Sequence, residues 1–430
     1  MEVGPTPDSL DVPPLTGVTD PYAVLRNRDF LFYLVGRFIA SLGQQMLTVA
    51  VGWQLYERTH SPLALGLVGL TQMGPMILFT LPAGHVADNY NRKRIIILMT
   101  LVIACASLGL TLVSAFGAAV PWIYFCLFVA GTARTFLWPA SSAFLPHLVS
   151  RSNFSRAVTW NSGSFHLSSV AGPAAGGALI ALRHHSSHDV NLAAATVYAA
   201  NTAASIICLT LISFVRRHHA VAIKEKITLK SLVAGFKFVF ASRIILGTIT
   251  LDLFAVLLGG ATALLPVYAK DILRVGPSGL GLLQAALPSG SLLCALILAH
   301  RPPLQKAGRA LLIAVIGFGL ATVGFGVSRW FWLSFAMLFL CGATDNISVV
   351  VRHTLVQLLT PDEKRGRVSA VNSLFIGTSN ELGGFESGTV ANYFGPVFAV
   401  VSGGLGTILV VVAVALIWPE IRRYGRLDAS

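Results

Sequence analysis

Seven ionisable residues lie inside long apolar stretches of the sequence, where few charges are expected: Arg37, Arg134, Asp252, Asp345, Arg352, Glu381 and Glu386. A charged side chain at the centre of a bilayer costs about 2.5–3.5 kcal/mol on insertion scales, so each such residue needs a partner or has a function. The chemistry open to these groups is ion pairing, binding of a charged molecule, or proton transfer.

Spacing along a helix separates some of these charges from one another. Asp345 and Arg352 lie seven residues apart, on one helix face but about 10 Å apart along the axis and out of direct contact. Glu381 and Glu386 lie five residues apart and point in different directions, so at most one faces a central cavity squarely. Glu381, beside Asn380, is the better candidate for contact with a substrate or a proton. Arg352 is expected to reach the cytoplasmic interface by snorkelling.

The composition indicates that a lipid bilayer surrounds these charges. Of 430 residues, 54% are hydrophobic and only 11% are charged, with a mean hydropathy of +0.72, whereas about a quarter of the residues are charged in a soluble domain. The net charge of +13 does not indicate nucleic-acid binding, because the basic residues form short clusters between apolar runs instead of one basic face. The five cysteines lie in apolar runs without metal-binding spacing, so we predict no disulfide framework, metal site or cofactor.

Twelve segments approach the length of about 20 apolar residues that a spanning helix needs. The predicted spans are 30–56, 62–83, 94–116, 120–144, 157–182, 192–215, 243–268, 278–300, 309–328, 330–352, 368–391 and 394–418. With both termini inside, 23 of the 31 Lys and Arg residues fall in cytoplasmic segments, five in outer loops and three within spans. This asymmetry predicts an even number of spans with both ends cytoplasmic. No cleavable signal peptide is visible, so we expect the first span to act as the insertion signal.

The longest polar stretch divides the chain near its middle. We predict a cytoplasmic tail (1–29), an N-terminal six-helix bundle (30–215), a cytoplasmic linker (216–242), a C-terminal six-helix bundle (243–418) and a second tail (419–430). Apolar residues alternate with lysines in the linker, which indicates an amphipathic helix on the inner membrane face or, alternatively, a plain basic linker. Offsets of 211 and 215 residues align similar positions of the two halves, which indicates a parallel repeat.

The loop between the second and third spans has a recognisable pattern at 84–94. It resembles the signature loop of the major facilitator superfamily, whose pattern is met here by Gly84, Asp88, Arg92 and Lys93. Asn89 and Asn91 replace a basic residue and a glycine of that pattern. Asp88 at a helix end can pair with a cation or cap a neighbouring helix, which predicts a gating loop that holds one conformation. The alternative is a positive-inside loop with one incidental acid.

A second motif lies in the fifth span, in the residues Gly172, Pro173, Gly176 and Gly177. It resembles the core of the exporter motif of the same superfamily. Proline opens the helical hydrogen-bond ladder and glycines let a neighbouring helix approach, so the motif predicts a bend and a tight seam. Helix packing alone is the alternative, and the resemblance favours export over import.

The segments 52–57, 360–368 and 379–388 resemble the subgroup of enterobactin exporters, macrolide efflux proteins and transmembrane secretion effectors. This resemblance implies an all-α polytopic membrane protein with twelve transmembrane helices in two pseudo-symmetric six-helix bundles. In that fold spans one, four, seven and ten line a central cavity, and the repeat offsets pair Arg37 with Asp252 and Arg134 with Asp345. Such pairs either form in one conformation and release an acid for a proton in another, with Asp252 and Asp345 as the better proton carriers, or are static and neutralise each other.

These features predict a transporter and not an enzyme. Because the sequence contains no GxxxxGK[ST] loop, transport is expected to run on an ion gradient. We predict export of an amphipathic small molecule by alternating access and proton antiport, by a monomer in the cytoplasmic membrane of a bacterium. A siderophore-like anion would meet Arg37 and Arg134, whereas a macrolide-like cation would meet Glu381 and the other acids. The alternatives are an importer or facilitator on the same fold and a membrane receptor or assembly factor.

Overall fold

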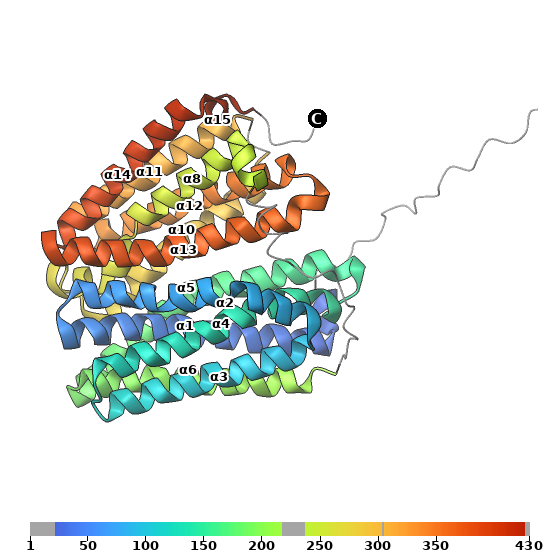
Figure 1. Ribbon diagram of the computed structural model, residues 1–430. Helices are drawn as coiled ribbons and strands as arrows, with labels where there is room; N and C mark the ends of the chain where they lie inside the picture. The colour runs from blue at the N-terminus through green and yellow to red at the C-terminus, as the bar shows by residue number, and fades with distance from the viewer. Residues whose placement is uncertain (1–21, 217–236, 303–304, 426–430) are drawn as a thin grey trace, which may run out of the picture.

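The computed structural model describes residues 22–216, 237–302 and 305–425, and within these ranges it contains helices and no strand. The two halves of the chain form two layers, which run from blue to green and from yellow to red in Figure 1. The long helices of the first half are α1 (Arg28–Thr59), α2 (Pro62–Asn89), α3 (Arg92–Ala115), α4 (Val120–Leu148), α5 (Phe154–Ser187) and α6 (Val190–Phe214). Those of the second half are α8 (Arg243–Leu258), α10 (Gly276–Ala299), α11 (Ala307–Val327), α12 (Phe331–Leu359), α13 (Asp362–Phe394) and α14 (Pro396–Ile417).

Local side-chain chemistry fixes several helix ends. The side chain of Asn27 accepts hydrogen bonds from the backbone N–H groups at the start of α1, and Asn91 and Asp189 cap α3 and α6 in the same way. These bonds satisfy amides that have no partner within the helix. At the other ends, α1 and α5 stop at His60 and His188, whose φ angles of 49° and 52° break the right-handed helix.

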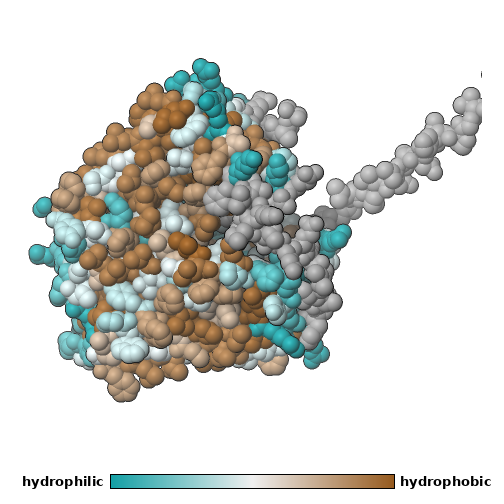
Figure 2. Space-filling model, viewed as in Figure 1, coloured by the Kyte–Doolittle hydropathy of each residue, from teal (hydrophilic) through white to brown (hydrophobic). Residues whose placement is uncertain are grey.

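The lengths and apolar surfaces of the helices suit a membrane. Eleven described helical segments are long and apolar enough to cross a bilayer, one of them the interrupted stretch Arg243–Ile272. Figure 2 shows apolar residues across the middle of one face with hydrophilic ones toward its two ends. The polytopic all-α prediction is confirmed. The predicted span 368–391 lies within α13, which has 33 residues but contains Asn380, Glu381 and Glu386 and is not among the eleven. The twelfth crossing therefore stays a prediction.

The seventh predicted span, 243–268, is not one continuous helix. The structure divides it into α8, the 3-10 turn η3 (Ala261–Leu264), the short helix α9 (Leu265–Val267) and the π-helical turn η4 (Tyr268–Ile272). The break falls at Gly259 and Gly260, where an added Cβ would lie 2.6 Å from the Phe318 ring and 2.8 Å from Ser387 Oγ, respectively. Close approach of α11 and α13 therefore requires glycine here, and two adjacent glycines weaken a helix.

The buried cores show how the two halves meet. We call the end of the bundle at which α6 ends and α8 begins the connector side, which lies to the right in Figure 1, and the opposite end the far side. One hydrophobic cluster on the far side combines both halves, with members such as Leu65 and Ile180 beside Leu280 and Ala391. Toward the connector side the clusters are separate, one within 24–215 and two within 239–421. The halves are thus packed together on the far side and separate on the connector side.

The remaining described segments are short. They are η1 (Ala23–Arg26), η2 (Arg151–Asn153), the helical residues 237–241 and α15 (Pro419–Arg423). The surface helix predicted within 216–242 lies largely outside the described residues, as do most of the two predicted tails.

Candidate functional site

A cavity of about 520 Å³ lies between the two halves. Its wall comes from α1, α2, α4 and α5 of the first half and from η3, α9, α10, α12 and α13 of the second. Apolar residues such as Leu47, Val68 and Leu287 line part of it. The polar side chains that line it are Gln44, Gln45, Thr48, Gln72, Arg134, Ser169, Thr262, Gln284, Asn380 and Glu381. This volume and this mixture are typical of a site for a drug-sized molecule.

One cation and one anion line this cavity, Arg134 on α4 and Glu381 on α13. They belong to different halves and attract each other electrostatically. No direct ion pair joins these two described side chains, and the buried Nε of Arg134 has no hydrogen-bond partner among the described residues. Each of these two side chains therefore compensates the charge of the other across the cavity, and a charged group of a bound molecule can take the place of either one.

Asp252 and Arg352 form a buried ion pair inside the second half. Asp252 on α8 is 8% exposed and Arg352 on α12 is 2% exposed. The expectation that Arg352 snorkels to the interface is wrong, because the carboxylate of Asp252 compensates its charge in the interior. In this conformation Asp252 is paired with Arg352 and not with Arg37, which lies beside Tyr33 on α1. A pair between Arg37 and Asp252 in another conformation stays a prediction.

Asp345 is not paired with Arg134 in this conformation, so the predicted pair between them stays a prediction. Asp345 lies on α12 close to Cys341, and it is not among the residues that line the cavity. The structure therefore does not bring Asp345 and Arg134 together as an ion pair within the described residues. The charged partner of Arg134 across the cavity is Glu381 instead.

The basic residues of the predicted gating loop hold the connector side of the first half together. Lys93 donates hydrogen bonds to the carbonyl oxygens of Ser213 and Val215, at 2.9 and 2.7 Å. These carbonyls end α6, where a cation is favoured by the helix dipole. Arg92 donates from Nε to the carbonyl of Ala87 at 3.3 Å and also contacts His147 of α4.

The other two residues of the loop, Asp88 and Gly84, make no comparable contacts. Asp88 is half-buried at the end of α2 and forms no ion pair or hydrogen bond with the described residues. A Cβ added to Gly84 would have no heavy atom within 4 Å. A contact of Asp88 that forms in one conformation and breaks in another therefore stays a prediction.

The glycine motif of α5 packs this helix against two neighbours. Added Cβ atoms on Gly172 and Gly176 would lie 3.0 Å from Leu42 O and 2.8 Å from Met46 Cα of α1, respectively. Gly177 faces the other half, where a Cβ would lie 2.9 Å from the Cα of Gly281 on α10. Pro173 lines the cavity, and α5 continues through it as one helix. Gly177 thus forms a close seam between the halves, and α2 and α13 form a similar one where Gly66 meets Gly388.

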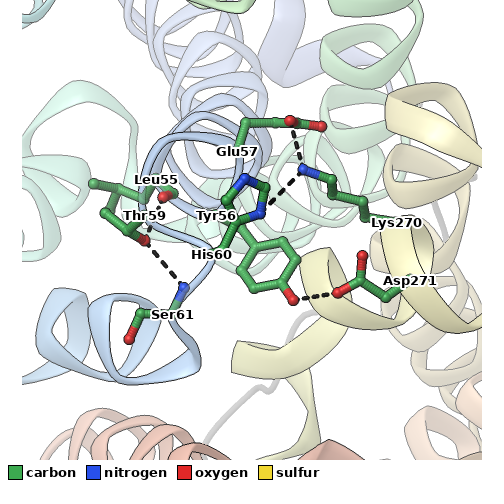
Figure 3. A network of polar contacts seen from close by, with 8 residues as sticks. All are labelled: Leu55, Tyr56, Glu57, Thr59, His60, Ser61, Lys270 and Asp271. Carbon is green, nitrogen blue, oxygen red and sulfur yellow. Dashed lines mark hydrogen bonds and ion pairs between the residues drawn. The ribbon is translucent and has the colours of Figure 1, made fainter.

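A cluster of polar residues joins the two halves on the far side (Figure 3). This far-side cluster consists of Tyr56, Glu57 and His60 at the end of α1 with Lys270 and Asp271 of η4. Lys270 Nζ donates to Glu57 Oε2 at 2.6 Å and lies 3.5 Å from His60 Nδ1. The hydroxyl of Tyr56 donates to the carboxylate of Asp271. Three charged or polar contacts therefore fasten the first half to the second at this end.

Comparison with known proteins decides the family. A model of the family described as transmembrane secretion effector matches residues 19–428. The chain belongs to the transmembrane secretion effector family. Enterobactin exporters from Shigella boydii and Escherichia coli O1:K1 are each 28% identical over 400 residues, which cover 92% of this chain and 93% of the relative.

Solved structures show that this family member has the major facilitator fold. A peptide transporter of the POT type has a TM-score of 0.71 at 10% identity, covering 92% of this chain and 95% of the other. A bacterial homologue of the lysosomal transporter Spinster, in an inward-facing and occupied conformation, has a TM-score of 0.70 at 15% identity, covering 94% and 96%. The family match and the enterobactin exporters confirm the predicted superfamily and subgroup, and these structures confirm the fold. The protein is a multi-pass transporter of the bacterial inner membrane, not an enzyme, and a small molecule is its substrate.

Sequence reasoning found part of the polar site of this transporter. It named Arg134 and Glu381 but assigned Arg134 to Asp345, and it missed Gln72, Gln284 and the far-side cluster. One feature of the sequence pointed to the far-side cluster. Lys270 is one of only five basic residues assigned to outer loops, where such residues are rare. Its partner Glu57 belongs to the other half, and no periodicity within one helix identifies such a neighbour.

Proposed function

We propose that the protein exports an amphipathic small molecule by alternating access, driven by protons that move inward. The observation that carries this proposal is the cavity between the halves, in which Arg134 and Glu381 face each other across space for a drug-sized molecule. The relatives that are enterobactin exporters support outward transport. A siderophore-like anion and a drug-like cation are both compatible with a wall that offers one charge of each sign.

We propose that the connector side and both termini face the cytoplasm. Most Lys and Arg residues of the connecting segments lie on this side, as the positive-inside rule requires. The conformation described here, with the halves packed together on the far side, then receives cargo from the cytoplasm. Separation of the far-side cluster and closure of the connector side would deliver the cargo outside.

Glu381 is the proposed proton carrier of the cavity. A carboxylate in a poorly solvated cavity is stabilised by the guanidinium of Arg134, and it binds a proton more readily when that guanidinium is engaged elsewhere. Asp252 is a weaker candidate in this conformation because Arg352 already neutralises it. Asp345 is a second candidate, since no described cation pairs with it directly. Both halves of the cavity come from one chain, so we propose that the monomer is the transporting unit.

Proton movement in acidified everted membrane vesicles tests the proposal. Siderophores, macrolides and lipophilic cations would be added in turn while a fluorescent dye reports the proton gradient. We expect one class to discharge the gradient with the natural protein and not with Glu381→Gln. Glu386→Gln is the matched control, because Glu386 lies on the same helix but does not line the cavity. If no compound acts with folded protein, or if Glu381→Gln acts like the natural protein, the proposed coupling is wrong.

Accumulation of cargo by intact cells would favour the importer over the exporter.

A further inference from the structure

We propose that the second half carries a binding site for an anionic phospholipid at the connector side, where α15 meets the start of α11. The site combines exposed cations with an adjoining apolar face for acyl chains. It goes beyond the proposed function, because it depends neither on the cargo nor on the direction of transport.

The segment that follows α14 has a fixed position against α11. Ile421 of α15 is fully buried, and a Cβ added to Gly308 would lie 2.8 Å from the carbonyl carbon of Ile421. The backbone N–H groups of Ala307 and Gly308 donate to the carbonyl oxygens of Gly425 and Tyr424, at 3.0 and 3.4 Å. The contact between Gly308 and Ile421 therefore holds the residues that flank it in place.

Exposed cations surround this contact. They are Lys306 and Arg309 at the start of α11, Arg422 and Arg423 of α15, and Arg243 at the start of α8. The carboxylate of Glu420 in α15 pairs with Arg243 at 2.9 Å. The other four cations form no direct ion pair within the described part of the chain. Arg309 directly follows Gly308, and Arg422 directly follows Ile421, so two guanidinium groups extend from the two sides of one backbone contact.

An apolar surface adjoins these cations. Ile313 lies one turn after Arg309 on the same face of α11 and is exposed. α14 packs against α11, and Leu416 and Ile417 are exposed in its last turn. Figure 2 shows apolar residues along α14 and hydrophilic ones at the end where Figure 1 places α15. A lipid with acyl chains along these two helices brings its phosphate to the level of the cations.

The chemistry of these cations selects an anionic headgroup. A guanidinium group donates two parallel hydrogen bonds to phosphate oxygens, and clusters of Lys and Arg beside a membrane attract anionic lipids. A phosphatidylcholine headgroup has a phosphate but also a quaternary ammonium, which the neighbouring cations repel. Phosphatidylglycerol carries the phosphate without that positive charge and therefore fits the site.

The start of α3 provides a comparison within the same chain. Arg94 is exposed there, and Leu98, one turn later, is exposed as well. The preceding cations, Arg92 and Lys93, already donate to backbone carbonyl oxygens. Arg94 thus has the cation and the apolar residue but lacks the pair of exposed guanidinium groups around one contact, which makes it the matched control.

Native mass spectrometry of the protein in detergent tests the inference, because it resolves each bound lipid. Phosphatidylglycerol and phosphatidylcholine with the same acyl chains would be titrated. We expect the first phosphatidylglycerol to bind at least about tenfold more tightly than phosphatidylcholine. The double variant Arg309→Gln with Arg422→Gln should weaken its binding about 10- to 30-fold. The variant with lysine at both positions should retain most of the binding, and Arg94→Gln should bind phosphatidylglycerol like the natural protein.

Thermal unfolding without added lipid would show that each variant is folded. Equal binding of the two lipids, or natural affinity for phosphatidylglycerol in the folded double glutamine variant, would overturn the inference. An equal loss of binding in Arg94→Gln would also overturn it, by showing a general effect of charge. Displacement of phosphatidylglycerol by an excess of inorganic phosphate would indicate a site for soluble anions and contradict the assignment to a lipid. None of these outcomes depends on proton movement in vesicles.

Discussion

Replacing Lys270 with glutamine should favour opening of the far side. Lys270 bridges the halves through its 2.6 Å contact with Glu57, and the two side chains are 22% and 21% exposed. Exposed ion pairs stabilise a protein by about 0.2–1 kcal/mol, whereas breaking a buried pair costs about 3–5 kcal/mol. The half-buried pair of Lys270 and Glu57 should contribute an intermediate energy. We therefore take about 1–2 kcal/mol as the stabilisation of the closed far side that Lys270→Gln removes. If the contact exists only when the far side is closed, the ratio of closed to open molecules falls about 5- to 30-fold.

The distance between the far-side loops of the two halves measures this ratio. Spin labels on Ala119→Cys and Arg329→Cys, in a background with Cys105→Ala because Cys105 is the exposed native cysteine, would report a short and a long population. Lys306→Gln is the matched control, since Lys306 is an exposed lysine on the connector side.

We expect Lys270→Gln to enlarge the population with the long distance, and Glu57→Gln to have the same effect. The double variant should show no larger effect than either single variant, because both remove the same contact. A distance distribution for Lys270→Gln that matches the Lys306→Gln control would refute the reasoning.

Three further predictions concern the packing within and between the halves. Asp252→Asn leaves Arg352 buried without its counter-ion, so the free energy of unfolding should fall by about 3–5 kcal/mol; thermal unfolding in detergent would measure this, and full stability would show the pair to be dispensable. Gly177→Val places side-chain atoms against α10 and should abolish transport in vesicles, whereas Gly163→Val should not, because Gly163 has open space around it. Equal transport activity of the two variants would contradict the close packing of α5 against α10. Lys93→Met should lower the free energy of unfolding by about 1 kcal/mol through loss of hydrogen bonds to the end of α6, with an unchanged thermal transition as the opposing result.

The helices could be predicted because the bilayer imposes their length and apolar character on the sequence. Apolar runs of spanning length and the one-sided distribution of basic residues are visible without any structure. The two adjacent glycines at the break, Gly259 and Gly260, are visible in the sequence. The close approach of α11 and α13 that requires glycine there is visible only in the structure. The low hydropathy of α13 reflects a helix that borders a polar cavity through Asn380 and Glu381.

Partners in the membrane interior could not be predicted in the same way. Repeat offsets align Arg134 with Asp345, but equivalent positions in two related halves need not face each other. The real neighbours depend on the rotation of each helix about its axis, and these rotations place Arg134 opposite Glu381 and Asp252 against Arg352. Helical spacing relates residues of one helix, and it does not determine which helix packs alongside.

Accessibility of the cavity from each side of the membrane tests the central claim most directly. A Gln72→Cys variant with Cys105→Ala would be treated with a membrane-impermeant maleimide in everted vesicles and in intact cells, with Arg329→Cys as a far-side reference. We predict that position 72 reacts in everted vesicles, reacts little in intact cells, and is protected by the compound that moves protons. Reaction mainly in intact cells, or no protection by that compound, would contradict a cargo cavity that opens to the cytoplasm.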